Sequence, residues 1–235
     1  MEGEVADTQL GGHLPDEVRS ATEHHTAVVV GGGQSGLATA YYLRRYEMDF
    51  LILDNQEEPG GAWLHAWPSL TLFSAAAFSN LPGWPMPQYP GYPPASHVID
   101  YLEHYERRYD LPARRPVHVR SVSHDGGMFF LDSTVGQFTA DHVVAATGTW
   151  SAPFVPHYPG TFRGRQWHSS TYPGPEPFRG AKVAVVGGAN SGAQIAADLL
   201  VTSEVTWFTL ERPRWMPDDV DGRDLFPVSY THLTL

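Results

Sequence analysis

One local pattern occurs twice in the sequence, and this repeat limits the folds that the chain can adopt. Each copy has a short valine-rich run, a glycine-rich turn, a run with helical spacing of apolar residues and a second apolar run. The first copy covers residues 26–54, and the second begins at residue 182. A strand, a tight turn, a helix and a parallel strand in this order form a βαβ unit. The sequence therefore predicts the α/β class, with parallel sheets built from two such units.

The first glycine turn has the spacing G-x-G-x-x-G, with Gly31, Gly33 and Gly36. The first glycine allows a sharp exit from the strand, the second lets the backbone approach a diphosphate, and the third lets helix and strand pack closely. The N–H groups at the helix N-terminus favour phosphate. Asp54 ends the second strand, where an acid binds ribose hydroxyl groups in Rossmann-like folds. We expect a dinucleotide here, with a purely structural turn as the alternative.

The second turn departs from this spacing, because Ala189 occupies the place of the middle glycine between Gly187 and Gly192. A methyl group there crowds the approach of a diphosphate. Two interpretations stay open: a second nucleotide site of altered geometry, or a degenerate repeat kept for packing. If both turns bind nucleotides, one nucleotide delivers hydride and the other, most economically a flavin, accepts it.

The residues after the second unit leave the choice of nicotinamide nucleotide open. Glu211 ends the predicted strand 204–210, and an acid there favours the 2′-hydroxyl of NADH. Arg212 and Arg214 follow directly and can pair with the 2′-phosphate of NADPH. An arginine pair in a loop is equally typical of a solvated surface.

Composition excludes several classes of function. The 235 residues contain no cysteine, so they supply no disulfide, iron–sulfur cluster or redox dithiol. A net charge of −11 argues against nucleic acid as a partner. No apolar run approaches the ~18 residues of a membrane helix, and the N-terminus lacks a signal-peptide pattern, so we expect a cytoplasmic protein. The histidine spacings predict no metal site.

Glycine- and proline-rich stretches divide the chain. Residues 59–94 predict an irregular loop whose aromatic side chains either line a pocket or pack in a core. A helix is expected over 96–110 and an antiparallel meander over 117–145. The predicted organisation is a disordered leader at 1–25, a first nucleotide-binding domain at 26–150, a linker at 151–181, a partial second domain at 182–226 and a tail at 227–235.

Three further motifs lie between and beside the two turns. The linker contains F-x-G-x-x-x-H-x-x-x-Y as Phe162, Gly164, His168 and Tyr172. Residues 146–148 read Ala-Thr-Gly, and residues 60–63 read Gly-Gly-Ala-Trp. With these motifs, residues 26–226 resemble the flavin-containing monooxygenases, above all the small bacterial members that include those of arsenic-resistance operons. Related Baeyer–Villiger enzymes usually end the fingerprint in tryptophan, so the tyrosine favours the branch that oxygenates heteroatoms.

The resemblance implies a mechanism and a set of site residues. In that family NADPH reduces FAD, O2 adds, and the resulting C4a-hydroperoxyflavin oxygenates a soft nucleophile, which is nitrogen, sulfur or arsenic. His168 is then implied to help position the nicotinamide, although a linker histidine bonded to backbone is the plainer interpretation. The implied FAD contacts are Gly31, Gly33, Gln34, Ser35, Gly36, Asp54, Gly61, Trp63, Thr147 and Gly148. The implied contacts of NADPH, with NADH as the alternative, are Gly187, Gly188, Asn190, Ser191, Gly192, Arg212 and Arg214.

The end of the chain departs from the family. Family members continue past residue 235, whereas residues 228–235 resemble translated adapter sequence. We expect a truncated reading frame with an incomplete second domain, a non-native tail at 227–235 and no turnover by this chain alone. The expected partners are a small-molecule substrate and O2. The alternatives are a Baeyer–Villiger-type or other NAD(P)H:flavin oxidoreductase, and an inactive nucleotide-binding fragment.

Overall fold

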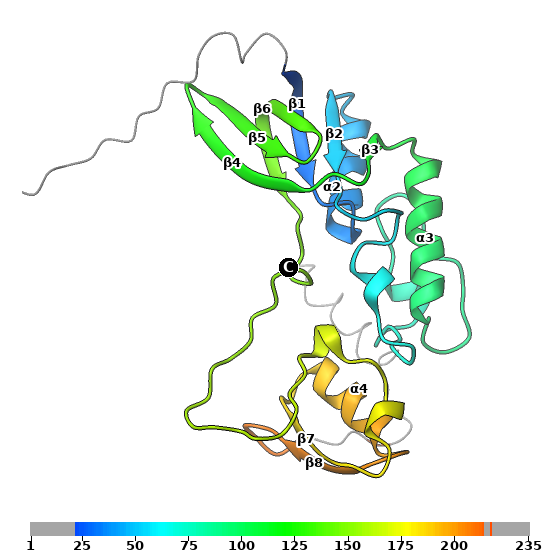
Figure 1. The fold of residues 1–235 in the computed structure, drawn as a ribbon. Coiled ribbons are helices and arrows are strands. Elements are labelled where there is room, and N and C mark those ends of the chain that lie inside the picture. Colours follow the sequence, from blue (N-terminus) through cyan, green and yellow to red (C-terminus); the bar gives the residue numbers. More distant parts are fainter. Residues whose placement is uncertain (1–21, 214–216, 218–235) are drawn as a thin grey trace, which may run out of the picture.

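The two copies of the repeat form two separate sheets in the computed structural model, which describes residues 22–213 and residue 217 (Figure 1). The larger sheet has the strand order β3-β2-β1-β6-β5-β4. Its strands are β1 (Glu23–Val30), β2 (Phe50–Leu53), β3 (Ala113–Arg114), β4 (Val119–Asp125), β5 (Met128–Ser133) and β6 (Gly136–Ala145). The smaller sheet pairs β7 (Lys182–Val186) with β8 (Glu204–Phe208). The helices are α2 (Gln34–Arg45), α3 (Ala95–Arg108) and α4 (Asn190–Leu199), with short 3₁₀ helices η1 (Gly61–His65), η2 (Ala76–Phe78), η3 (Ser169–Thr171) and η4 (Glu176–Phe178).

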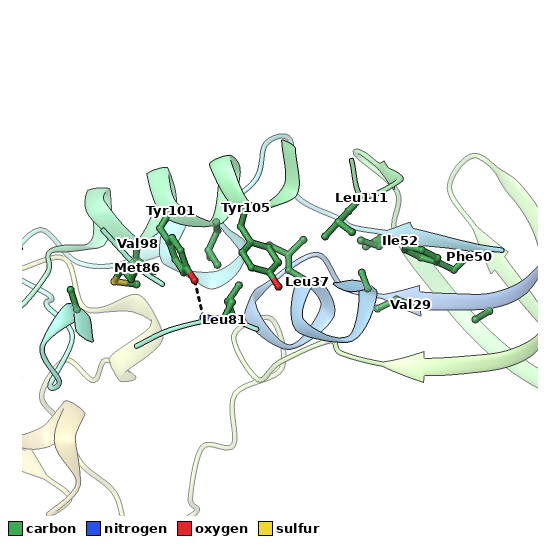
Figure 2. Packing of buried hydrophobic residues seen from close by; sticks show 14 residues of the cluster. Val29, Leu37, Phe50, Ile52, Leu81, Met86, Val98, Tyr101, Tyr105 and Leu111 are labelled. Carbon is green, nitrogen blue, oxygen red and sulfur yellow. Dashed lines mark hydrogen bonds between the residues drawn. The ribbon is translucent and has the colours of Figure 1, made fainter. Parts of the chain in front are cut away.

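The central strand of the larger sheet is β1, which pairs in parallel with β2 on one side and β6 on the other. Successive side chains of a strand point to opposite faces. Val29 accordingly packs with Ile52 beneath α2 and α3 (Figure 2), whereas Val28 packs on the opposite face with Leu131 and Phe138 of the meander. Both faces of β1 are therefore covered, as its valine-rich sequence requires.

Two tyrosines of α3 fix the proline-rich loop at residues 59–94 to that helix. The hydroxyl of Tyr101 accepts a hydrogen bond from the N–H of Leu81 at 2.8 Å (Figure 2) and donates to the carbonyl of Trp84 at 2.6 Å. Tyr105 donates to the carbonyl of Pro82 at 2.6 Å. Burial raises the pKa of both hydroxyls, so they remain protonated donors. The loop is irregular, but its backbone is fixed by these side chains.

We call the larger sheet with α2, α3 and the loop at residues 59–94 the first unit, and β7, α4 and β8 the second unit. The core of the second unit includes side chains from the loop of the first. Val185 of β7 packs with Ile195 and Leu199 of α4 in one buried cluster. Trp67 belongs to the same cluster, and Leu70 packs against it. In Figure 1, α4 lies on the side of its sheet that faces the first unit. The loop that follows β2 therefore joins the two units.

The observed elements confirm the α/β class and change three predicted boundaries. β1 begins at Glu23, so residues 23–25 belong to the sheet and not to the predicted leader, because they pair with residues 138–140. The predicted helix 96–110 runs over Ala95–Arg108, and β8 ends at Phe208 instead of residue 210. Residues 1–21 of the predicted leader and the tail at 227–235 lie outside the described residues. Among the helices of the described residues, none is long and apolar enough to cross a membrane.

Candidate functional site

The first glycine turn has the geometry that its spacing predicts. Gly31 leaves β1 with φ of +109°, a conformation that side chains disfavour. A Cβ at Gly31 would also overlap the carbonyl of Ala146, and one at Gly36 would overlap the carbonyl of Gly31. The outer glycines are therefore required by the packing of the protein itself.

The middle glycine faces an opening instead. A Cβ at Gly33 would have the Cα of Gly61 as its nearest neighbour, 3.8 Å away. Gly61 has φ of +56° and points its own missing side chain back at Gly33, with 2.8 Å to the Cα. Gly33 is also the N-cap of α2, so no side chain fills the space before the first helical N–H groups. This side-chain-free approach to a helix N-terminus fits a diphosphate group.

A cavity of about 300 Å³ surrounds this opening. Nine of the ten residues predicted to contact FAD line it, and the tenth, Gly36, serves helix packing instead. The nine are Gly31, Gly33, Gln34, Ser35, Asp54, Gly61, Trp63, Thr147 and Gly148. Residues from the first strand, the loop after β2 and the end of β6 thus converge on one space.

Asp54 has an arginine partner that the sequence analysis missed. The carboxylate is 3% exposed, and its Oδ2 accepts a hydrogen bond from Nε of Arg115 at 2.7 Å. Arg115 also donates from both terminal nitrogens to Glu106 of α3, at 2.8 and 2.7 Å. Burial works against the charged form of Arg115, but the hydrogen bonds and charges of Glu106 and then Asp54 raise its pKa above the usual value. The predicted ribose-binding acid is therefore a member of a buried ionic cluster.

The second turn repeats the geometry of the first with one substitution. Gly187 has φ of +126°, and a Cβ at Gly192 would overlap the carbonyl of Gly187. The indole N–H of Trp207 donates to that same carbonyl at 2.8 Å. Ala189 is the N-cap of α4, and its methyl group cannot accept a hydrogen bond from the helix. The N-terminus of α4 is thus available to an anion, beside the methyl group that the sequence places there.

A second cavity, of about 490 Å³, is lined by residues from the starts of both repeat helices. Gln34 and Trp63 line it from the first unit, while Asn190, Ser191 and Gln194 line it from α4. Its remaining walls are Leu70, Thr71, Leu72, Phe73, Ser74, Phe78, Ser79, Leu81, Met86, Val98, Tyr101 and Leu102. The N-terminal ends of both repeat helices therefore open on one largely apolar space.

The aromatic residues of the loop divide between the two roles that the sequence left open. Trp63, Phe73 and Phe78 line the larger cavity. Trp67 is a core residue of the second unit, and Trp84 packs against the core of the first. The loop is thus a cavity wall at some positions and a packing segment at others.

The fingerprint of the linker is spread over several environments. His168 caps η3, because its Nδ1 accepts the N–H of Ser170 at 3.2 Å and hydrogen-bonds the Ser170 hydroxyl at 2.8 Å. It lines neither of the two cavities, so its role toward a nicotinamide stays a prediction. Tyr172 is buried, with its ring 5.8 Å from that of Trp67 and its hydroxyl donating to Asp198 at 2.9 Å. Burial, and then this hydrogen bond, raises the pKa of Tyr172.

The residues predicted to select the nicotinamide nucleotide lie at the end of the described chain. Glu211 and Arg212 follow β8 and are exposed, and Arg214 lies outside the described residues. Gly187, Gly188 and Gly192 form the second turn without lining either cavity. Within the described part of the chain, no group of three or more His, Asp or Glu residues is placed to hold a metal ion.

Known proteins are similar to this chain in sequence and in fold. A sequence profile for the pyridine nucleotide-disulphide oxidoreductases matches residues 28–224. The chain belongs to this family. Since the 235 residues contain no cysteine, they offer no thiol for the disulphide chemistry in the family's name.

Individual relatives are flavin monooxygenases and oxidoreductases. An uncharacterized CzcO-like oxidoreductase of Geobacillus kaustophilus is 33% identical over 202 residues, or 85% of this chain and 58% of that protein. Indole-3-pyruvate monooxygenase YUCCA6 of Arabidopsis thaliana is 33% identical over 211 residues, or 85% and 50% of the two chains. The structure of a flavin-containing monooxygenase from Stenotrophomonas maltophilia aligns with a TM-score of 0.83 and 48% identity, covering 88% of this chain and 64% of that one.

These matches confirm the resemblance to flavin monooxygenases and the oxidoreductase class. The chain spans 58% and 50% of the lengths of the two curated relatives. Its own reaction is accordingly inferred from the site.

Proposed function

We propose that the protein is an FAD- and NADPH-dependent monooxygenase that uses O2 to oxygenate a nitrogen, sulfur or arsenic atom of a small molecule. The observation that supports this proposal is the larger cavity, of about 490 Å³, which Gln34 at the start of α2 and Asn190 and Ser191 at the start of α4 line together. Two nucleotides bound at the two helix N-termini would extend their reactive rings into this shared space.

The first turn is the proposed FAD site. Its side-chain-free approach between Gly33 and Gly61 admits a diphosphate, and the N–H groups of α2 would bind it. Asp54 lines the same cavity and would accept hydrogen bonds from ribose hydroxyls. When bound, FAD supplies the electron acceptor and the activation of O2.

The second turn is the proposed site of the nicotinamide nucleotide. The N-terminus of α4 lies beside Ala189, whose methyl group weakens the approach of a diphosphate compared with Gly33. A donor that must leave after each turnover needs only moderate affinity. Arg212 is exposed in the segment that follows β8 and would pair with the 2′-phosphate of NADPH, with NADH as the alternative donor.

The walls of the shared cavity would keep the reacting atoms from water. Leu72, Phe73, Leu81, Met86 and Leu102 bring apolar side chains to it. Such an apolar enclosure would keep water away from the oxygenation chemistry that FAD supplies when bound.

An absorbance spectrum tests the proposal directly. The full-length protein is purified and reconstituted with FAD. It should absorb at about 450 nm, and anaerobic addition of NADPH should bleach that band. Retention of FAD without bleaching would favour the inactive nucleotide-binding alternative. A protein that retains no FAD would contradict the assignment of the first turn.

A product assay separates the two oxygenation chemistries. The reduced protein is exposed to O2 with a thioether or with a cyclic ketone, and the products are analysed by mass spectrometry. A sulfoxide supports the proposed function, whereas a lactone supports the Baeyer–Villiger alternative.

A further inference from the structure

Arg115 joins three segments of the first unit at one buried point. It lies between β3 and β4, and its side chain is 9% exposed. Its guanidinium contacts Asp54 at the end of β2 and Glu106 on α3, whose side chains are 4% and 14% exposed. The cluster thus contains two carboxylates and one cation, all largely removed from water.

The fork of the guanidinium divides its donors between the two acids. Both terminal nitrogens engage the two oxygens of Glu106, which fixes the plane of the group. Nε is then directed at Oδ2 of Asp54, at 2.7 Å. Within residues 22–213, the hydrogen bond to the Asp54 carboxylate is at Oδ2, and none is made to its other oxygen, Oδ1. One carboxylate oxygen is therefore fixed and the other is left for a ligand in the smaller cavity.

The cluster also touches the glycine turn itself. A Cβ added to Gly32 would lie 2.5 Å from Oδ2 of Asp54 and 2.6 Å from a terminal nitrogen of Arg115. The ion pair therefore occupies the space where the second turn residue would have a side chain. The ion pair therefore lies directly against the backbone that would approach the diphosphate. The residues that would bind the ribose and those that would bind the diphosphate are thus in contact with each other.

An unpaired Asp54 would not hold the same charge or orientation. A buried carboxylate without a cation either takes up a proton or rotates toward water, and both changes weaken it as an acceptor of ribose hydroxyls. We propose that Arg115, anchored by Glu106, is the positioning residue that presents Oδ1 of Asp54 to the adenosine ribose of FAD. This inference rests on the proposed FAD site and adds the two residues that make its acid selective for a ribose hydroxyl.

The test compares FAD with its 2′-deoxyadenosine analogue, whose affinities are measured by flavin fluorescence titration. The native chain should bind FAD about tenfold more tightly, as expected for one hydrogen bond to a charged group. Arg115→Lys cannot bridge both acids, and Glu106→Gln removes the anchor's charge while keeping its shape. We expect both variants to lower the preference to about twofold.

Arg114 provides a matched control. It is the adjacent arginine and binds a single glutamate, Glu23, through both terminal nitrogens at 2.7 and 2.8 Å. Arg114→Lys should keep the tenfold preference. A merely structural role for Arg115 would weaken both flavins equally and leave the ratio unchanged, which would overturn the proposal. If Arg115→Lys fails to fold, the ratio of the two flavin affinities in Glu106→Gln tests the proposal in its place.

The remaining outcomes separate this inference from the function on which it rests. A native chain that binds both flavins equally contradicts the inference while the FAD site stands. A native chain that binds neither contradicts both.

Discussion

The two glycine turns have the same local geometry in different surroundings. Gly31 and Gly187 have φ of +109° and +126°, and the last glycine of each turn packs on the carbonyl of the first. β1 is covered on both faces, whereas β7 has β8 as its partner and leaves Val186 61% exposed. The spacing of glycines therefore sets the turn, and the neighbouring strands and helices set its burial.

The residue after the first glycine of each turn shows the chemical side of the same difference. Gly32 lies against the buried pair of Asp54 and Arg115, whereas a Cβ at Gly188 would make an ordinary 3.4 Å contact with Thr209. The first turn is built into an ionic cluster, whereas among residues 22–213 no ion pair involves the glycines of the second turn. This contrast fits a resident nucleotide in the first site and an exchanging one in the second.

The largest difference between the turns is expected when a methyl group is added to their last glycines. Gly36→Ala places a Cβ against the Gly31 carbonyl in a buried unit, and it should lower the free energy of unfolding by about 3 kcal/mol. Gly192→Ala makes the equivalent contact in the more exposed unit, where the backbone can shift, and should cost about 1 kcal/mol. Urea denaturation followed by circular dichroism measures both. Equal losses would show that burial does not set the cost.

The middle positions of the turns test affinity instead of stability. Gly33→Ala places its methyl group at an ordinary 3.8 Å contact with Gly61, so it should leave the FAD-free protein as stable as before while weakening FAD at least tenfold, about 1.4 kcal/mol. The reverse exchange, Ala189→Gly, should strengthen NADPH binding about threefold. Thermal unfolding and fluorescence titration provide the two readouts. Normal FAD affinity in Gly33→Ala would contradict the assignment of the first turn.

The contact between the units gives a smaller effect. Tyr172→Phe removes the hydrogen bond to Asp198 but keeps the ring against Trp67, so the second unit should lose about 1 kcal/mol. Hydrogen exchange of α4 reports this loss directly. Tyr158→Phe, at an exposed position of the linker, is the control and should change nothing. Unaltered hydrogen exchange of α4 in Tyr172→Phe would show that this hydrogen bond does not stabilise the second unit.

The smallest effect concerns the ion pairs at the start of β1 and at the start of β7. Hydrogen bonds from Arg114, and then from His25, lower the pKa of Glu23 to about 2 from an ordinary 4.5. A depressed pKa stabilises the fold above the unfolded value, and this contribution is lost as the pH falls from about 4.5 to about 2. Both partners are about 40% exposed, so solvent limits the contribution to less than about 1 kcal/mol.

Lys182 and Glu204 form the corresponding pair of the second unit, with 3.6 Å between charged atoms. Glu23→Gln should therefore destabilise the protein at pH 7 but not at pH 2, while Glu204→Gln should have no effect at either pH. Denaturant midpoints at the two pH values check this. An equal change of the midpoint in both variants would contradict the expected difference between the two ion pairs.

The sequence predicts what is local and misses what is brought together by folding. The two turns follow from glycine spacing, because φ and close packing are decided within a few residues. The positions of Val98 and Tyr105 on the buried face of α3 follow from helical periodicity. Arg115 and Glu106 carry no such pattern, since an arginine beside another arginine reads as surface charge until three segments enclose it. Trp67 in a proline-rich loop gave no indication that it belongs to the core of the other unit.

The insertion of Trp67 and Leu70 into the second cluster has a practical consequence for engineering. A chimaera that exchanges the second unit at the linker would separate that unit from two residues that pack in its core. Transplanting the loop around residues 67–70 together with β7, α4 and β8 would keep the graft intact. The structural boundary between the two units therefore runs through the loop of the first unit and does not coincide with the linker at residues 151–181.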